Sequence, residues 1–147
     1  MVFVRVLLYV RANCPYCSMV EPRLRNALRS VGVELVTRHI EVPGAFIDLP
    51  DNVVIYNTET GEVVTRSAVD KRELLMTPIL RIDAYGAYGD EFTILIPAIA
   101  TYMVDETGKK VYNVRAAIDR YVENVTALVR ELITEGRGGT VYIRHID

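Results

Sequence analysis

The sequence contains no glutamine, no tryptophan and only three lysines, against 14 arginines in 147 residues. Its formal net charge is −2, so no basic surplus indicates a nucleic acid or an anionic membrane as a partner. The absence of glutamine and the many charged side chains are typical of thermophilic proteins, and we expect a thermophilic source.

Long apolar runs are also missing. The apolar stretch Val2–Val10 is interrupted by Arg5 and is too short to span a bilayer. No secretory cleavage pattern follows it. We therefore expect a cytoplasmic protein without a membrane partner. The length favours one domain, 1–147, that can build its core without a metal or disulfide staple.

Cysteine is equally scarce, because Cys14 and Cys17 are the only two. Two cysteines cannot form a disulfide framework, and a close pair in a reducing compartment indicates redox or metal chemistry. A closed zinc site needs four ligands, and the two histidines, His39 and His145, form no tight motif. We predict no metal and no cofactor beyond a redox-active Cys14–Cys17 disulfide. Two inert buried thiols are the plain alternative.

The first 42 residues read as a strand, a helix and a strand. Val2–Val10 is nearly continuous apolar, as in a strand covered on both faces. Val20, Leu24 and Leu28 begin an apolar stripe at helical spacing within a helix from Pro15 to about Ser30. A second strand is predicted at 33–42, which completes a βαβ unit.

The remaining segments alternate between hairpins, strands and helices. The composition predicts hairpins at 52–67 and 98–114, strands at 79–86 and 91–96, a short helix at 67–76, a long helix at 115–135 and a last strand at 140–146. The mixture of elements indicates an α/β fold.

The Cys14–Cys17 segment lies where the first strand passes into the helix. Unpaired N–H groups and a partial positive charge at a helix N-terminus favour a thiolate at Cys14. Cys14 can then attack a substrate disulfide, and Cys17 can resolve the mixed disulfide. Pro15 restricts the loop, and Arg11 adds positive charge.

Cys14-Pro15-Tyr16-Cys17 resembles the active-site tetrapeptide of glutaredoxins and of archaeal protein disulfide oxidoreductases, in the thioredoxin superfamily. The helix start "CPYCSMVEP" is similar to that of thioredoxins, including a proline at Pro22. The resemblance implies a thioredoxin-like three-layer α/β sandwich with a central mixed sheet. Its parts would be a βαβ half (1–42), a hairpin insertion (about 43–96), a ββα half (97–135) and a C-terminal strand extension (138–147).

Members of this superfamily carry a cis-proline opposite the cysteines. "IPAIATYMVDETGKKVY" resembles the thioredoxin pattern and makes Ile96-Pro97 the preferred site, while "LLMTPILRID" offers Thr77-Pro78 as the alternative. The resemblance implies that substrate binding involves Arg11, Pro15, Tyr16, Ile96 and Pro97, or Thr77 and Pro78 in place of the last two.

The implied activity is thiol–disulfide exchange with protein disulfides, recharged by a reductase. Two features depart from the family. Leu8 stands where thioredoxins carry a buried acid, and "GKKVYNV" lacks the Gly-Gly stretch and acid of glutathione-binding members. Glutathione is therefore not expected as a specific partner. The alternative function is a non-catalytic binding module with a structural or regulatory cysteine pair. The sequence leaves the oligomeric state open.

Overall fold

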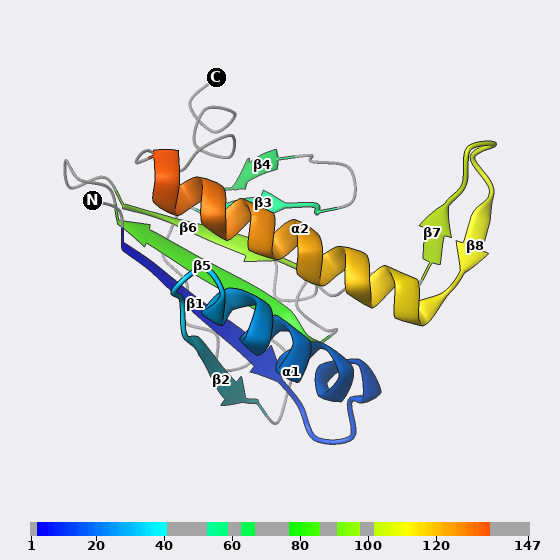
Figure 1. Ribbon diagram of the computed structural model, residues 1–147, viewed down its shortest axis with the longest axis horizontal. Helices are drawn as coiled ribbons and strands as arrows, with labels where there is room; N and C mark the ends of the chain where they lie inside the picture. The colour runs from blue at the N-terminus through cyan, green and yellow to red at the C-terminus, as the bar shows by residue number, and fades with distance from the viewer. Residues whose placement is uncertain are drawn as a thin grey trace.

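The structure is a computed structural model. It describes residues 3–40, 53–58, 63–66, 77–85, 91–97 and 102–135. The elements, drawn in Figure 1, are β1 (Phe3–Val10), α1 (Pro15–Arg29), β2 (Leu35–His39), β3 (Val53–Tyr56), β4 (Val63–Arg66), β5 (Ile79–Tyr85), β6 (Glu91–Ile96), β7 (Tyr102–Val104), β8 (Lys110–Tyr112) and α2 (Val114–Glu135). The predicted α/β class is confirmed. No helix in these ranges is both long and apolar enough to cross a membrane.

Six strands form one mixed sheet in the order β2-β1-β5-β6-β3-β4. β1 and β2 are parallel, as the predicted βαβ unit requires. β5 runs antiparallel to β1 on its other side, and β6 runs antiparallel to β5. The hairpin of β3 and β4 extends the sheet beyond β6. β2 and β4 are therefore the two edge strands.

This topology corrects the predicted division of the chain. The segment assigned to an insertion, about 43–96, contains β5 and β6, which are central strands of the sheet. The hairpin assigned to the ββα half forms a separate two-stranded sheet of β7 and β8. The prediction went wrong because a turn motif indicates a hairpin without specifying which sheet the hairpin joins. The predicted helix at 67–76 and the strand at 140–146 lie outside the described residues.

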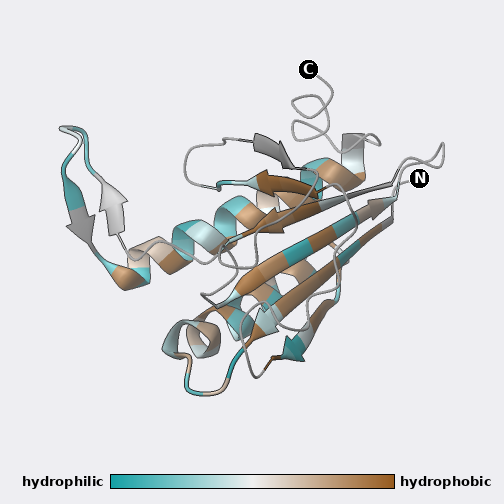
Figure 2. Cartoon of the chain, turned by 180° about the vertical axis from the view of Figure 1, so that it is seen from behind, coloured by the Kyte–Doolittle hydropathy of each residue, from teal (hydrophilic) through white to brown (hydrophobic). Residues whose placement is uncertain are grey.

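Both described helices cover the same face of the sheet (Figure 1). The main core lies between them and the strands, where α1 contributes Val20, Leu24 and Leu28 at one-turn spacing. A second cluster, with Leu7, Tyr9, Ile40, Ile79 and Leu95, is buried on the opposite face. Figure 2 shows the molecule from behind, so that this face is toward the viewer. Hydrophilic segments interrupt the mostly hydrophobic central strands there. Of the predicted three layers, the sheet and one helical layer are thus described.

A buried ion-pair network interrupts the apolar pattern on the opposite face. Asp83 in β5 is 4 % exposed. Its carboxylate accepts hydrogen bonds from Arg81 Nε at 3.0 Å, Arg5 Nη2 at 3.3 Å and Thr93 Oγ1 at 2.9 Å. Burial opposes the charge on Arg81, but the hydrogen bond and charge of Asp83, together with Tyr9, outweigh it and raise the pKa of Arg81.

The turn between β7 and β8 is held by one carboxylate. Asp105 accepts hydrogen bonds from the Thr107 hydroxyl at 2.7 Å and from the backbone N–H groups of Thr107 and Lys109, both at 2.9 Å. These bonds, led by the Thr107 hydroxyl, lower the pKa of Asp105. Gly108 has φ +82°, a left-handed conformation that glycine adopts without strain. The predicted turn is therefore confirmed.

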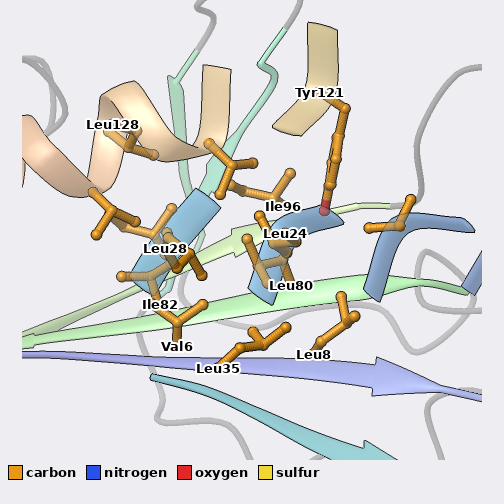
Figure 3. Packing of buried hydrophobic residues seen from close by; sticks show 14 of the residues in the cluster. Val6, Leu8, Leu24, Leu28, Leu35, Leu80, Ile82, Ile96, Tyr121 and Leu128 are labelled. Atoms are coloured by element: carbon orange, nitrogen blue, oxygen red, sulfur yellow. The ribbon is translucent and has the colours of Figure 1, made fainter. Parts of the chain in front are cut away.

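One side chain in the main core carries a polar atom without a partner. Tyr121 of α2 is 1 % exposed, and its hydroxyl has no hydrogen-bond partner among the residues that the structure describes. Figure 3 shows the ring descending from α2 toward α1, with Leu24 and Ile96 beside its oxygen. Burial raises the pKa of the Tyr121 phenol. A buried unpaired hydroxyl costs about 1–3 kcal/mol of folding free energy.

We expect Tyr121→Phe to raise the free energy of unfolding by about 1–3 kcal/mol, because the ring still packs and the unpaired hydroxyl is gone. The gain should be measured by urea denaturation. Because burial raises the pKa of Tyr121 in the folded protein, the phenol ionises first in the unfolded state, and the wild type loses stability as the pH rises above the ordinary tyrosine pKa of about 10. The variant should therefore lose less stability than the wild type above pH 10. Equal or lower stability at neutral pH would show that the hydroxyl is satisfied.

Candidate functional site

The two cysteines lie at the start of α1 and form a disulfide. Cys14 is the N-cap residue and Pro15 occupies the first helical position, where its missing N–H leaves no bond unmade. The Cα atoms of Cys14 and Cys17 are 5.3 Å apart. One turn of helix therefore brings the two sulfur atoms together.

The two sulfurs differ in access and in contacts. Cys17 is 4 % exposed and packs in the main core, whereas Cys14 is partly exposed. The backbone N–H of Cys17 donates a hydrogen bond to Cys14 Sγ at 3.2 Å. No acidic residue lies in the first turn of α1. Cys14, the more exposed of the two cysteines, is thus also the one whose sulfur lies at the positive end of the helix.

Thr77 meets Cys14 from a position 63 residues away in the sequence. Its hydroxyl donates a hydrogen bond to Cys14 Sγ at 3.3 Å, and its carbonyl oxygen lies 3.6 Å from the same sulfur. The contact follows from topology. Because β5 is antiparallel to β1, the beginning of β5 lies beside the end of β1, where Ile79 pairs with Tyr9. Thr77 itself is 5 % exposed.

Thr77-Pro78 is the cis peptide bond among the described residues. The preferred assignment of the cis-proline to Ile96-Pro97 is therefore wrong, and the alternative is correct. Pro97 follows β6, and Ile96 pairs with Leu80 near the start of β5, so both prolines lie at the same end of these two paired strands. β5 separates β6 from β1, however. Ile96 is 2 % exposed in the main core.

The other predicted substrate-binding residues near the cysteine pair in the sequence differ in exposure. Pro15 and Arg11 are exposed, and Tyr16 is partly buried against the main core. The contacts of Cys14 described above involve Cys17 and Thr77 and do not include Arg11. Asn13, directly before Cys14, has φ +59°, a conformation that asparagine tolerates better than most residues.

The sequence predicted the cysteine pair and its helix, but not the hydroxyl contact. Thr77 was identified only as the residue before a possible cis-proline. The available signal was a Thr-Pro step before a strand-like run, and the resemblance of the Ile96-Pro97 segment to the thioredoxin pattern was preferred over it. Leu8 of β1 is fully buried in the main core.

The described residues bring no three His, Cys, Asp or Glu side chains together in a way that would hold a metal ion. The arrangement offers instead a disulfide with one partly exposed cysteine, Cys14, two hydrogen-bond donors to its sulfur and a helix that begins directly after it. Comparison with family models, curated proteins and solved structures gave no match.

Proposed function

We propose that the protein is a thiol–disulfide oxidoreductase of the thioredoxin superfamily that exchanges disulfides with protein substrates. The observation that carries the proposal is the meeting of the Cys14–Cys17 disulfide with Thr77 at the N-terminus of α1. A purely structural disulfide does not require a partly exposed cysteine whose sulfur accepts two hydrogen bonds.

The topology supports the same assignment. A thioredoxin-like core is a βαβ half followed by a ββα half, with the two halves sharing one sheet. Here β1, α1 and β2 form the first half, and β5, β6 and α2 form the second, with the order β2-β1-β5-β6 in the sheet. The β3–β4 and β7–β8 hairpins are then additions to this core.

The proposed reaction begins with the reduced protein. The Cys14 thiolate attacks one sulfur of a substrate disulfide, so that this bond breaks, a mixed disulfide forms and the other substrate sulfur leaves as a thiolate. Cys17, once deprotonated, attacks Cys14 in the mixed disulfide. The Cys14–Cys17 bond forms, the second substrate thiolate leaves, and two electrons have passed to the substrate. A dithiol reductase restores the reduced form by the reverse sequence.

Exposure and hydrogen bonding assign the two roles. Cys14 is the partly exposed cysteine, and Cys17 is buried beside it. In the reduced state, the Cys17 N–H and the Thr77 hydroxyl can both donate to a Cys14 thiolate, and the helix N-terminus favours its charge. β1 supplies no carboxylate to take the Cys17 proton, because Leu8 fills the relevant position. That proton passes to solvent or to the departing substrate thiolate.

The test is the reactivity of the reduced protein. Alkylation of Cys14 should be followed against pH, and insulin reduction by dithiothreitol should be followed with and without the protein. We expect the alkylation midpoint to lie below the free-cysteine value of about 8.5 and insulin reduction to accelerate. A midpoint near the free value with no acceleration would instead favour the non-catalytic binding module.

Thr77→Val should lower the alkylation rate of Cys14 roughly tenfold below the midpoint, because a hydrogen bond to a charged group contributes about 1.5–3 kcal/mol. Valine has nearly the same shape but cannot donate. Thr77→Ser keeps the hydroxyl and should restore the rate, which serves as the matched control. If Thr77→Val and Thr77→Ser lower the rate equally, the hydroxyl does not stabilise the thiolate and packing explains the effect.

A further inference from the structure

The outer edge of β2 has a self-complementary pattern that none of the proposed chemistry uses. β2 is the end strand of the six-stranded sheet and pairs on one side only, with β1 (Figure 1). Glu34, Val36 and Arg38 are all exposed, and alternation along the strand puts them on one face of the sheet. Val36 is 42 % exposed, and among the residues whose burial is described only Tyr85 joins it as an exposed large hydrophobic side chain.

The backbone groups that face outward can be identified from two hydrogen bonds. The N–H of Ile40 donates to the carbonyl of Val10 at 2.9 Å, so even-numbered residues of this segment face β1. The Leu35 carbonyl instead accepts from Arg25 Nη1 at 2.9 Å, on the outer side. Leu35, Thr37 and His39 therefore direct their backbone groups toward the open edge.

This alternation restricts how a second copy can add to the edge. In an antiparallel pair, outward-facing residues must oppose one another, which allows registers centred on Leu35, Val36, Thr37 or Arg38. Only the register centred on Val36 sets Glu34 of one copy opposite Arg38 of the other, and does so twice. The register centred on Arg38 instead brings two arginines together. Opposite charges facing each other across strands are favourable and like charges are not.

We propose that two copies of this chain associate through antiparallel pairing of β2, with the two-fold axis at Val36. Leu35 of each copy then exchanges backbone hydrogen bonds with Thr37 of the other. Two Glu34–Arg38 pairs flank a Val36–Val36 contact. The joined sheet contains the six described strands of each copy. Because β2 is parallel to β1 within each copy, the two β1 strands run in opposite directions, and the two Cys14 sites lie at opposite ends of the strands.

Arg25 is compatible with this pairing. A carbonyl oxygen has two lone pairs, so the Leu35 carbonyl can accept from Arg25 and from a backbone N–H of the second copy. Arg25 Nη2 also donates to Thr37 Oγ1 at 2.9 Å and to Glu21 Oε1 at 3.3 Å. The ion pair with Glu21 offsets the charge of Arg25 on the helix side of the two-fold axis.

The test exchanges the charges at positions 34 and 38 and measures the dimer Kd by sedimentation velocity over a wide concentration range. The wild type should approach twice the monomer mass. Glu34→Arg should raise the dimer Kd roughly tenfold or more, since two attractive pairs become two repulsive ones. Arg38→Glu should do the same, and the double variant Glu34→Arg/Arg38→Glu should restore dimerisation. Glu123→Arg makes the same change on the exposed side of α2 and should leave the Kd unchanged.

Restoration by the double variant distinguishes pairing from a folding defect, because a damaged strand would not be repaired by a second substitution. Far-UV circular dichroism of each variant checks the fold directly. A wild type that stays monomeric at the highest concentration overturns the proposal. A dimer whose Kd does not respond to Glu34→Arg and Arg38→Glu also overturns it, because the copies would then meet elsewhere. Neither result bears on the redox activity.

Discussion

Cys14→Ser is expected to lower insulin reduction roughly 10³-fold or more, because it removes the attacking nucleophile. Cys17→Ala should also abolish turnover, but for a different reason. Cys14 can still attack a substrate, and without Cys17 the mixed disulfide has no resolving thiol. The Cys17→Ala protein should therefore accumulate covalent adducts that dithiothreitol releases, whereas Cys14→Ser should accumulate none.

The asymmetry follows from the structure, in which Cys14 is partly exposed and Cys17 is 4 % exposed. The measurement is non-reducing electrophoresis with mass spectrometry of the adducts, using reduced protein mixed with a disulfide-containing substrate. The double variant Cys14→Ser/Cys17→Ala is the control for non-specific association. Adducts on Cys17 in the Cys14→Ser protein, at the level seen for Cys17→Ala, would contradict the assigned roles.

Asp83→Ala is expected to lower the free energy of unfolding by about 3–5 kcal/mol. Asp83 is 4 % exposed, and its carboxylate pairs with the guanidinium groups of Arg5 and Arg81. The Arg81 side chain is only 15 % exposed. Removing Asp83 leaves Arg81 with its desolvation cost and without the charge that offsets it. Chemical denaturation of both proteins measures the difference.

Asp119→Ala provides the matched control. Asp119 also forms an ion pair with an arginine, Arg23, but its side chain is 62 % exposed. Solvent screens such a pair, and its loss should cost about 0–1 kcal/mol. Combining Asp83→Ala with Arg81→Met should recover part of the lost stability, since the desolvated guanidinium that lost the Asp83 carboxylate is then removed as well. Equal losses for Asp83→Ala and Asp119→Ala would show that the buried network contributes no more than a surface pair.

Local patterns in the sequence determined the elements near the cysteines. The apolar run before Cys14, the Pro15 start and the Val20–Leu24–Leu28 spacing require only neighbouring residues, and β1 and α1 appear within a residue of their predicted bounds. The same holds for α2, whose apolar stripe runs from Ile118 to Leu132. The Asp105–Gly108 turn is likewise local, because one carboxylate and one glycine define it.

Strand partners, by contrast, were decided only by the tertiary structure. The sequence contains two similar hairpin patterns with a glycine in the turn. Neither pattern predicts that β3 and β4 join the main sheet or that β7 and β8 form a separate two-stranded sheet. The choice between Pro97 and Pro78 depended on the same information. Placing β5 beside β1 brings Thr77 to Cys14, and that pairing joins residues more than sixty positions apart. Local strand propensity does not predict such a contact. The free energy that favours the β1–β5 pairing comes from burial of apolar side chains over the whole sheet.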